Sequence, residues 1–181
     1  MNRKDYALRS MKEDDLSLIL QWRNSEKIRE VMYSNEEISW EEHYNWFQNM
    51  KERSDYKVYI FTFKEKPVGI VNFRHINFDH RRCEWGLYIG EEKTPKGTGI
   101  VMGVYAIEKA FHEMKMHKIC SHVLVNNTAS CRYHEKMGFD IEGRLVDHVR
   151  RGESYIDVWQ LALFQSKWED WKHQLTKNWE G

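Results

Sequence analysis

The chain has 181 residues, which suits one domain with a core that needs no disulfide or metal to hold it. Its 28 Lys and Arg residues balance 28 Asp and Glu residues, so it lacks the positive field that draws proteins to nucleic acid or anionic membranes. Three cysteines without CxxC spacing disfavour a disulfide framework or a zinc site. No apolar run is long enough for a membrane span, and no signal peptide is visible. We therefore expect a metal-free, cytoplasmic, single-domain protein over residues 1–181.

The first elements are predicted from the spacing of apolar residues. A short strand at Tyr6–Ser10 precedes helical spacing over residues 14–32, which breaks near Asn24. Ser39 and Glu42 then form a capping box, in which each side chain reaches an unpaired backbone amide of the other. A second helix should begin there.

The rest of the chain alternates between segments with the strand period of two residues and segments with the helical period of about 3.6 residues. The predicted strands are 57–63, 68–76, 83–89, 117–125, 139–149 and 154–164, and the predicted helices are 97–114, 128–137 and 168–179. A strand–helix–strand unit in the middle implies a parallel strand pair. The order predicts an α/β fold with a mixed central sheet of about seven strands and helices on both faces.

A glycine-containing loop joins one predicted strand to the long helix after it. The loop reads Lys96-Gly97-Thr98-Gly99-Ile100-Val101. Glycines allow a ligand to approach the backbone closely, and a helix N-terminus offers free amides and partial positive charge, which suits a pyrophosphate. The loop matches neither a Walker motif nor the dinucleotide fingerprint. An ordinary tight turn is the alternative interpretation.

A second segment follows the next predicted strand, and it favours the pyrophosphate site over an ordinary tight turn. It contains Asn127 and Ser130 and ends in Glu135-Lys136-Met137-Gly138-Phe139. Together with the glycine loop, this segment resembles the GNAT family of acetyltransferases over roughly residues 6–171. The resemblance implies the fold given above and acetyl-CoA as the cosubstrate. It places the coenzyme on the following residues: Leu87, Tyr88, Ile89, Lys96, Gly97, Thr98, Gly99, Ile100, Val101, Asn127 and Ser130.

The N-terminal half and the strand before the loop resemble one branch of the family more closely. That branch acetylates the 4-amino group of UDP-linked amino-deoxysugars in pseudaminic acid synthesis. By this resemblance a UDP-aminosugar is the expected acceptor, and its pocket is formed by Met32, Tyr33, His43, Trp46 and Tyr88. Plain core packing is the alternative for the helical residues among them. A homodimer is compatible with the sequence.

Two residues depart from the family's pattern, and two others are candidates for the catalytic base. Val101 replaces a small residue of the family's loop, so its side chain should point into the fold while its amide stays free to donate. His134 stands where many family members have a tyrosine that protonates the leaving thiolate, so this role passes to His134, to Ser130 or to no residue. Helical spacing puts Ser130 and His134 on one face, with Tyr133 aside. His122 and Glu84 are candidates for the base that accepts the amine's proton.

Other functions remain open at this stage. The C-terminal stretch resembles the ribosomal-protein acetyltransferase branch, so the acceptor can also be a protein N-terminus, or a polyamine. A polyamine enzyme should have an acidic acceptor cleft, and a nucleotide-sugar enzyme a basic or aromatic one. A coenzyme A-binding regulatory domain with little turnover is an alternative of another class. The sequence determines neither the acceptor, nor the base, nor the oligomeric state.

Overall fold

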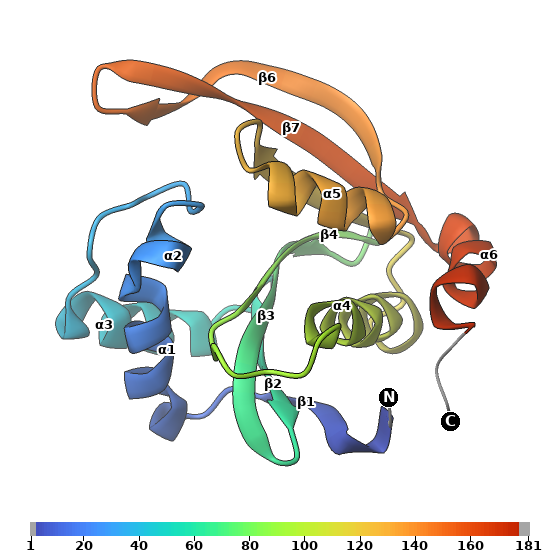
Figure 1. The fold of residues 1–181 in the computed structure, drawn as a ribbon, viewed down its shortest axis with the longest axis horizontal. Coiled ribbons are helices and arrows are strands. Elements are labelled where there is room, and N and C mark those ends of the chain that lie inside the picture. The colour runs from blue at the N-terminus through green and yellow to red at the C-terminus, as the bar shows by residue number, and fades with distance from the viewer. Residues whose placement is uncertain (1–2, 178–181) are drawn as a thin grey trace.

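A seven-stranded mixed sheet organises the chain in the computed structural model, which describes residues 3–177 (Figure 1). The strands lie in the order β1-β2-β3-β4-β5-β7-β6, and every neighbouring pair is antiparallel except β4 and β5. This is the mixed α/β sheet that the sequence predicts. The strands are β1 Tyr6–Ser10, β2 Lys57–Phe63, β3 Lys66–Asn77, β4 Arg82–Ile89, β5 Lys118–Leu124, β6 Asp140–Arg151 and β7 Ser154–Phe164.

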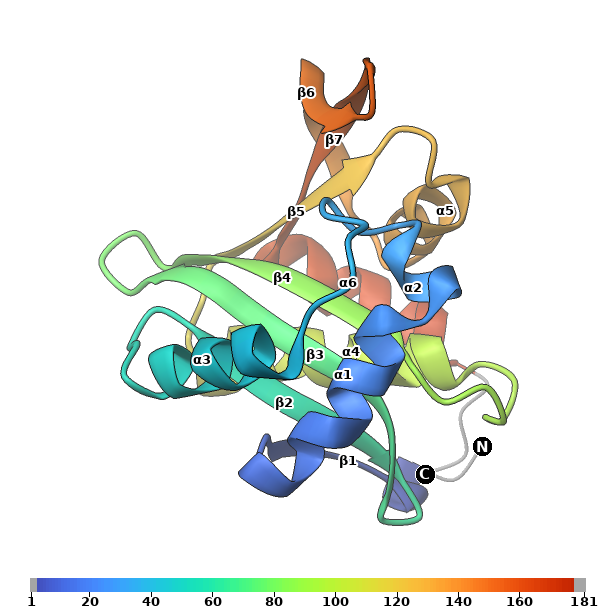
Figure 2. The same ribbon diagram turned by 90° about the vertical axis from the view of Figure 1, so that its left-hand side faces the viewer.

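Helices cover both faces of this sheet, with α1 and α3 on one face and α4 on the other (Figure 2). The predicted helix break falls at Ser25, but the second piece ends at Arg29 rather than Met32. The long middle helix finishes as a π-helical turn, and the last helix begins three residues early; the end of its predicted range, residues 178–179, lies outside the described part. The helices are α1 Leu16–Asn24, α2 Glu26–Arg29, α3 Trp40–Lys51, α4 Thr98–Glu108, α5 Thr128–Lys136 and α6 Gln165–Thr176, with short turns η1 Arg3–Asp5, η2 Glu13–Asp15 and η3 Lys109–Glu113.

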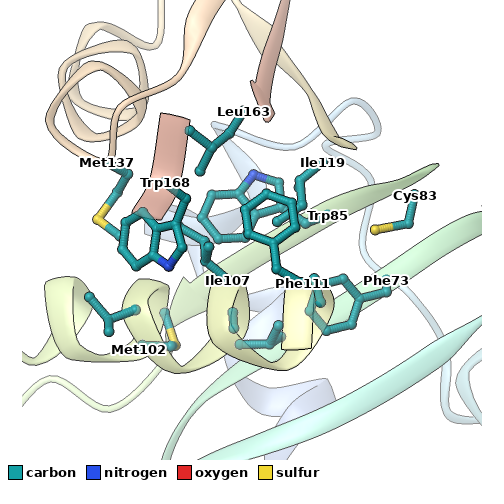
Figure 3. Close-up of a cluster of buried hydrophobic side chains, with 14 of the residues drawn as sticks. Phe73, Cys83, Trp85, Met102, Ile107, Phe111, Ile119, Met137, Leu163 and Trp168 are labelled. Carbon is teal, nitrogen blue, oxygen red and sulfur yellow. The ribbon is translucent and has the colours of Figure 1, made fainter. Parts of the chain in front are cut away.

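The alternation of side chains along the strands divides the core into two layers. Val58 and Ile60 of β2 face α1 and α3, whereas Phe61 faces α4. The larger layer lies under α4, α5 and α6, and Figure 3 shows Trp85 and Trp168 within it. None of the described helices is both long and apolar enough to cross a bilayer.

Local signals in the sequence fix the start of α3. The Ser39 hydroxyl accepts from the Glu42 amide at 3.2 Å, and the Glu42 carboxylate accepts from the Ser39 amide at 2.8 Å. The predicted capping box is therefore confirmed. Apolar residues of α3 then pack against β2 and β3.

Candidate active site

A cavity of about 530 Å³ opens where β4 and β5 separate. The two parallel strands are paired at only three positions, the last being Glu84 with Cys120. Beyond this point β4 continues along β3 and β5 continues along β7, so the facing backbone groups of the two strands lack a strand partner. The cavity is lined by Arg23, Val31, Met32, Tyr33, Ser34, Asn72, Arg74, Trp85, Gly86, Leu87, Tyr88, Ile89, Gly99, Met102, Ser121, His122, Val123, Leu124, Asn127, Ala129, Ser130, Tyr133 and His134.

The strand period of two gives this cavity two chemically different sides. Trp85 belongs to the core layer under α4, while Tyr88 packs with the layer under α1 and α3. On β5 the same alternation separates neighbours, since Ser121 contacts α5 and His122 contacts Glu84. The cavity therefore passes through the sheet from the α4–α5 side to the α1–α2 side.

The glycine loop forms the start of α4 at the edge of the cavity. Gly97 has φ +91°, which strongly favours glycine. A Cβ on Gly99 would meet only Ile89, at 4.0 Å, so the protein itself leaves room for a side chain there. Among the described residues, the amides of Gly97 and Gly99 donate to no backbone carbonyl. Two free amides and open space at a helix N-terminus suit an anion.

Thr98, Ile100 and Val101 make hydrogen bonds within the loop and the first turn of α4. Val101 is buried, as predicted, but its amide donates to the Gly97 carbonyl at 3.2 Å, and the Ile100 amide donates to the same oxygen at 2.9 Å. The Thr98 hydroxyl donates to the Pro95 carbonyl at 2.7 Å. The expectation of a free amide at Val101 is thus wrong, because the first turn of α4 tightens around Gly97. Lys96 precedes this turn and does not line the cavity.

The N-terminus of α5 forms the opposite wall. The Asn127 side chain caps the helix by accepting from the Ser130 amide at 3.0 Å, and both residues line the cavity. Tyr133 crosses to α4, where its hydroxyl donates to the Gly99 carbonyl at 2.8 Å. His134 points instead to the closed end of the cavity, together with Ser130. The predicted separation of the two rings is confirmed, although both rings line the cavity.

Glu84 and His122, the two candidate bases, lie next to each other. Glu84 Oε2 is 3.5 Å from His122 Nδ1, and Glu84 also contacts Arg74 and His75 at 3.1 and 3.0 Å. Hydrogen bonding with His122, then with His75, and the charge of Arg74 outweigh desolvation and lower the pKa of Glu84 to about 2. A carboxylate with so low a pKa is a weak base. The arrangement makes Glu84 the partner that orients His122, whose ring lines the cavity.

The α1–α2 side of the cavity is basic and aromatic. Met32, Tyr33 and Tyr88 line it, as the sequence predicts. Arg23 and Arg74 line it too, although the sequence analysis did not select them. The clearest available signal was the alternation on β3, where polar Asn72 and Arg74 interrupt an apolar strand; nothing comparable marks Ser121 on β5.

Two residues predicted for the acceptor pocket lie elsewhere. His43 and Trp46 do not line the cavity, and their rings stack on each other at 5.1 Å. His43 is 4% exposed, and Trp46 packs against the small core layer formed by α1, β2 and β3. The reason is the direction of α3, whose apolar face covers the sheet instead of the gap between β4 and β5. The placement of these two residues in the acceptor pocket is thus corrected to core packing.

Comparison with known proteins identifies the fold and the chemistry. The model of the acetyltransferase (GNAT) domain family matches residues 6–140. The chain belongs to this family. It is a GNAT N-acetyltransferase, a class that takes its acetyl group from acetyl-CoA.

Relatives of two substrate classes are similar to the chain. Spermidine N(1)-acetyltransferase from Vibrio cholerae is 27% identical over 90% of this chain and 94% of its own length. Acetyltransferase PseH from Campylobacter jejuni is 25% identical over 72% of this chain and 80% of its own length. The crystal structure of the Vibrio cholerae spermidine enzyme with CoA and spermine has a TM-score of 0.85 and 25% identity, covering 92% of this chain and 99% of that one.

Replacing Gly99 by Asp is expected to weaken acetyl-CoA binding at least tenfold. The structure has room for the side chain, but its charge would oppose a pyrophosphate at the free amides. Titration calorimetry measures the affinity. Gly99→Ala, which adds the Cβ without the charge, is the control and should lose much less. Unchanged affinity in Gly99→Asp would locate the coenzyme elsewhere.

Buried histidine should make the protein less stable in mild acid. Burial lowers the pKa of His43, and a hydrogen bond with the Leu16 backbone opposes this only in part. The unfolded chain, with a pKa near 6.5, then binds the proton first. The contribution of neutral His43 is therefore full above about pH 6.5 and is lost as pH falls toward the folded-state pKa.

Urea unfolding at pH 7 and pH 5 tests this expectation. We expect the free energy of unfolding to be lower at pH 5 than at pH 7, because the unfolded chain then takes up a proton that folded His43 resists. His43→Phe keeps a ring against Trp46 but cannot titrate, so its slope with pH should be shallower than that of the wild type. Equal slopes would exclude His43 as the source.

Proposed function

We propose that this acetyltransferase moves the acetyl group from acetyl-CoA to the amine of a small molecule by direct attack, without an acyl-enzyme. The main support is the cavity through the sheet. At one edge it has free backbone amides that suit an anion, and on the other side it has the His122–Glu84 pair. A coenzyme entering from the α4 side and an amine entering from the α1–α2 side would meet between β4 and β5.

Coenzyme binding follows from groups that the fold leaves free. The pyrophosphate is assigned to the amides of Gly97 and Gly99. The pantetheine arm then runs along the separated edge of β4, where the backbone of residues 85–89 lacks a partner strand on its β5 side and can pair with the arm's amides. Asn127 lines the same cavity with its side-chain oxygen engaged in capping α5, which leaves its amide nitrogen for the arm.

The chemical step requires a neutral amine, a polarised carbonyl and a proton acceptor. A backbone N–H of Leu87, Tyr88 or Ile89 would donate a hydrogen bond to the thioester carbonyl oxygen. His122 accepts the proton that the attacking nitrogen loses. Ionised Glu84 holds the ring in place through its Nδ1. Positioning of both substrates supplies the rest of the acceleration.

Similarity to known enzymes and the charge of the cavity lining favour different acceptor classes. Similarity favours a polyamine, since the spermidine enzyme matches more of the chain than PseH does. The lining of the cavity favours an anionic acceptor. Among the described residues that line it, none is Asp or Glu, and Glu84 beside it is already shared by three cationic or imidazole groups. A polyamine would meet Arg23 and Arg74 without a free carboxylate to pair with.

Arg23 is the residue that most favours a phosphate-bearing acceptor. Its Nη2 donates to the Ser34 carbonyl at 2.8 Å, while its Nη1 is buried without a hydrogen-bond partner. Burial is the main cause that lowers the pKa of Arg23, and repulsion from Arg29 and Arg151 adds to it. A UDP-linked aminosugar would bring the phosphate oxygens that such a guanidinium binds. Tyr33 and Tyr88 offer rings for the sugar or base.

His122→Gln is expected to lower kcat by about 10²- to 10⁴-fold at neutral pH while leaving acetyl-CoA affinity unchanged, because it removes the proton acceptor alone. Thiol-release kinetics and calorimetry measure the two quantities. His75→Gln is the matched control, since His75 also contacts Glu84 but lies outside the cavity. A kcat within threefold of the wild type in His122→Gln would refute the assignment.

Arg23→Gln is expected to distinguish the two acceptor classes. For a UDP-linked 4-amino-sugar we expect KM to rise about 10- to 100-fold, as for loss of hydrogen bonds to a charged group. For spermidine, KM should stay the same or fall. Arg53→Gln, which changes an exposed arginine paired with Asp55, is the control. Efficient turnover of spermidine by the wild type, with none of the sugar nucleotide, would decide for the polyamine.

A further inference from the structure

Three buried side chains close the inner end of the cavity. Trp85, Ser121 and His134 are 2%, 4% and 6% exposed, and all three line it. Trp85 and Ser121 stand one residue beyond the last β4–β5 pair, where the strands begin to diverge. His134 reaches them from α5, with its Nε2 3.1 Å from Trp85 Nε1 and 2.8 Å from Ser121 Oγ.

The partners of His134 fix its tautomer. An indole N–H can only donate, so His134 Nε2 must offer a lone pair to Trp85. A carbonyl can only accept, so His134 Nδ1 must carry the proton that goes to the Ser130 carbonyl at 2.8 Å. Both ring nitrogens are therefore engaged in the neutral form. The single N–H of the ring points along α5 and not into the cavity.

His134 is consequently a poor proton donor for a leaving thiolate. Burial lowers its pKa, and the hydrogen bond to Ser130 opposes this shift only in part. A second proton on Nε2 would also confront the Trp85 N–H with another donor. The ring is better suited to holding its neighbours in place.

Ser121 carries a hydroxyl whose hydrogen can be redirected. Its Oγ lies 2.8 Å from Nε2, which has no proton, so the hydroxyl donates to the lone pair that the Trp85 N–H also uses. Because two donors share this one neutral acceptor, the hydroxyl can turn its hydrogen to a thiolate that forms in the cavity, while the Trp85 N–H keeps Nε2 satisfied. Ser121 and His122 are neighbours on β5 and point to opposite sides of the sheet. His122 thus lies on the amine side, and Ser121 on the coenzyme side.

We infer that the Ser121 hydroxyl donates a hydrogen bond to the departing thiolate of coenzyme A, and that His134 is a positioning residue for it. The inference depends on the proposed function, because that function places the thioester at the inner end of the cavity. The amine nitrogen forms the new C–N bond, and the C–S bond breaks with its electron pair going to sulfur. The nitrogen's proton goes to His122. Ser121 keeps its own proton, and the thiolate is protonated from water.

Thiol-release kinetics with the acceptor that the wild type uses test the inference. Ser121→Ala should lower kcat about 10- to 100-fold, as for loss of one hydrogen bond to a charged group, with KM for acetyl-CoA within about twofold. Ser121→Thr keeps the hydroxyl and should recover most of kcat. Thermal unfolding of each variant verifies that the fold is intact.

His134 variants separate positioning from acid catalysis. His134→Gln places an amide near the Nε2 position and can still accept from Trp85, yet an amide cannot protonate a thiolate. It should retain most of kcat and the wild-type pH profile, whereas His134→Ala should lose activity. Equal losses in both, with an altered alkaline limb, would make His134 the acid and overturn the inference.

Two further outcomes would also overturn it, and they are distinguishable. A Ser121→Ala variant with normal kcat and a raised KM for acetyl-CoA would place the hydroxyl on the pantetheine arm. A wild-type protein that binds acetyl-CoA but releases no thiol with any amine tested, including spermidine and the sugar nucleotide, would refute the proposed function, and this inference with it.

Discussion

The separation of β4 and β5 is the constraint on which the site depends. Parallel strands normally pair along their length, but here the pairing ends after three positions. Each strand continues along its antiparallel neighbour on the other side while the two diverge from each other. Their unpaired backbone groups need hydrogen-bond partners, which an amide-bearing chain lying in the gap would supply. In the proposed function the same gap would admit a second substrate from the opposite side.

Strand alternation turns this single gap into a site with separate compartments. Side chains at successive positions of β4 and β5 face opposite sides of the sheet, so groups for the coenzyme and groups for the acceptor come from neighbouring residues. His122 and Ser121 are the clearest pair. The chain's zero net charge conceals an uneven lining, because Arg23 and Arg74 line the cavity while none of the described residues that line it is Asp or Glu.

The inner end of the cavity is built around the two ring nitrogens of His134. They satisfy the Ser130 carbonyl and the Trp85 N–H. Such a fully hydrogen-bonded group is costly to disturb in a buried setting. Its contacts hold Trp85 and Ser121 in place beside the cavity.

The sequence by itself determined the order of the elements, the capping box at Ser39 and the glycine loop at the start of α4, because each depends on the spacing of residues close together in the chain. Through family resemblance it also selected Tyr33 and Tyr88, which both line the cavity. Only the tertiary structure placed His43 in the core and Arg23 at the cavity, because the direction of a helix face depends on which sheet residues it packs against. Hydrogen bonding across the gap was likewise decided by contacts between distant segments, which no local pattern encodes.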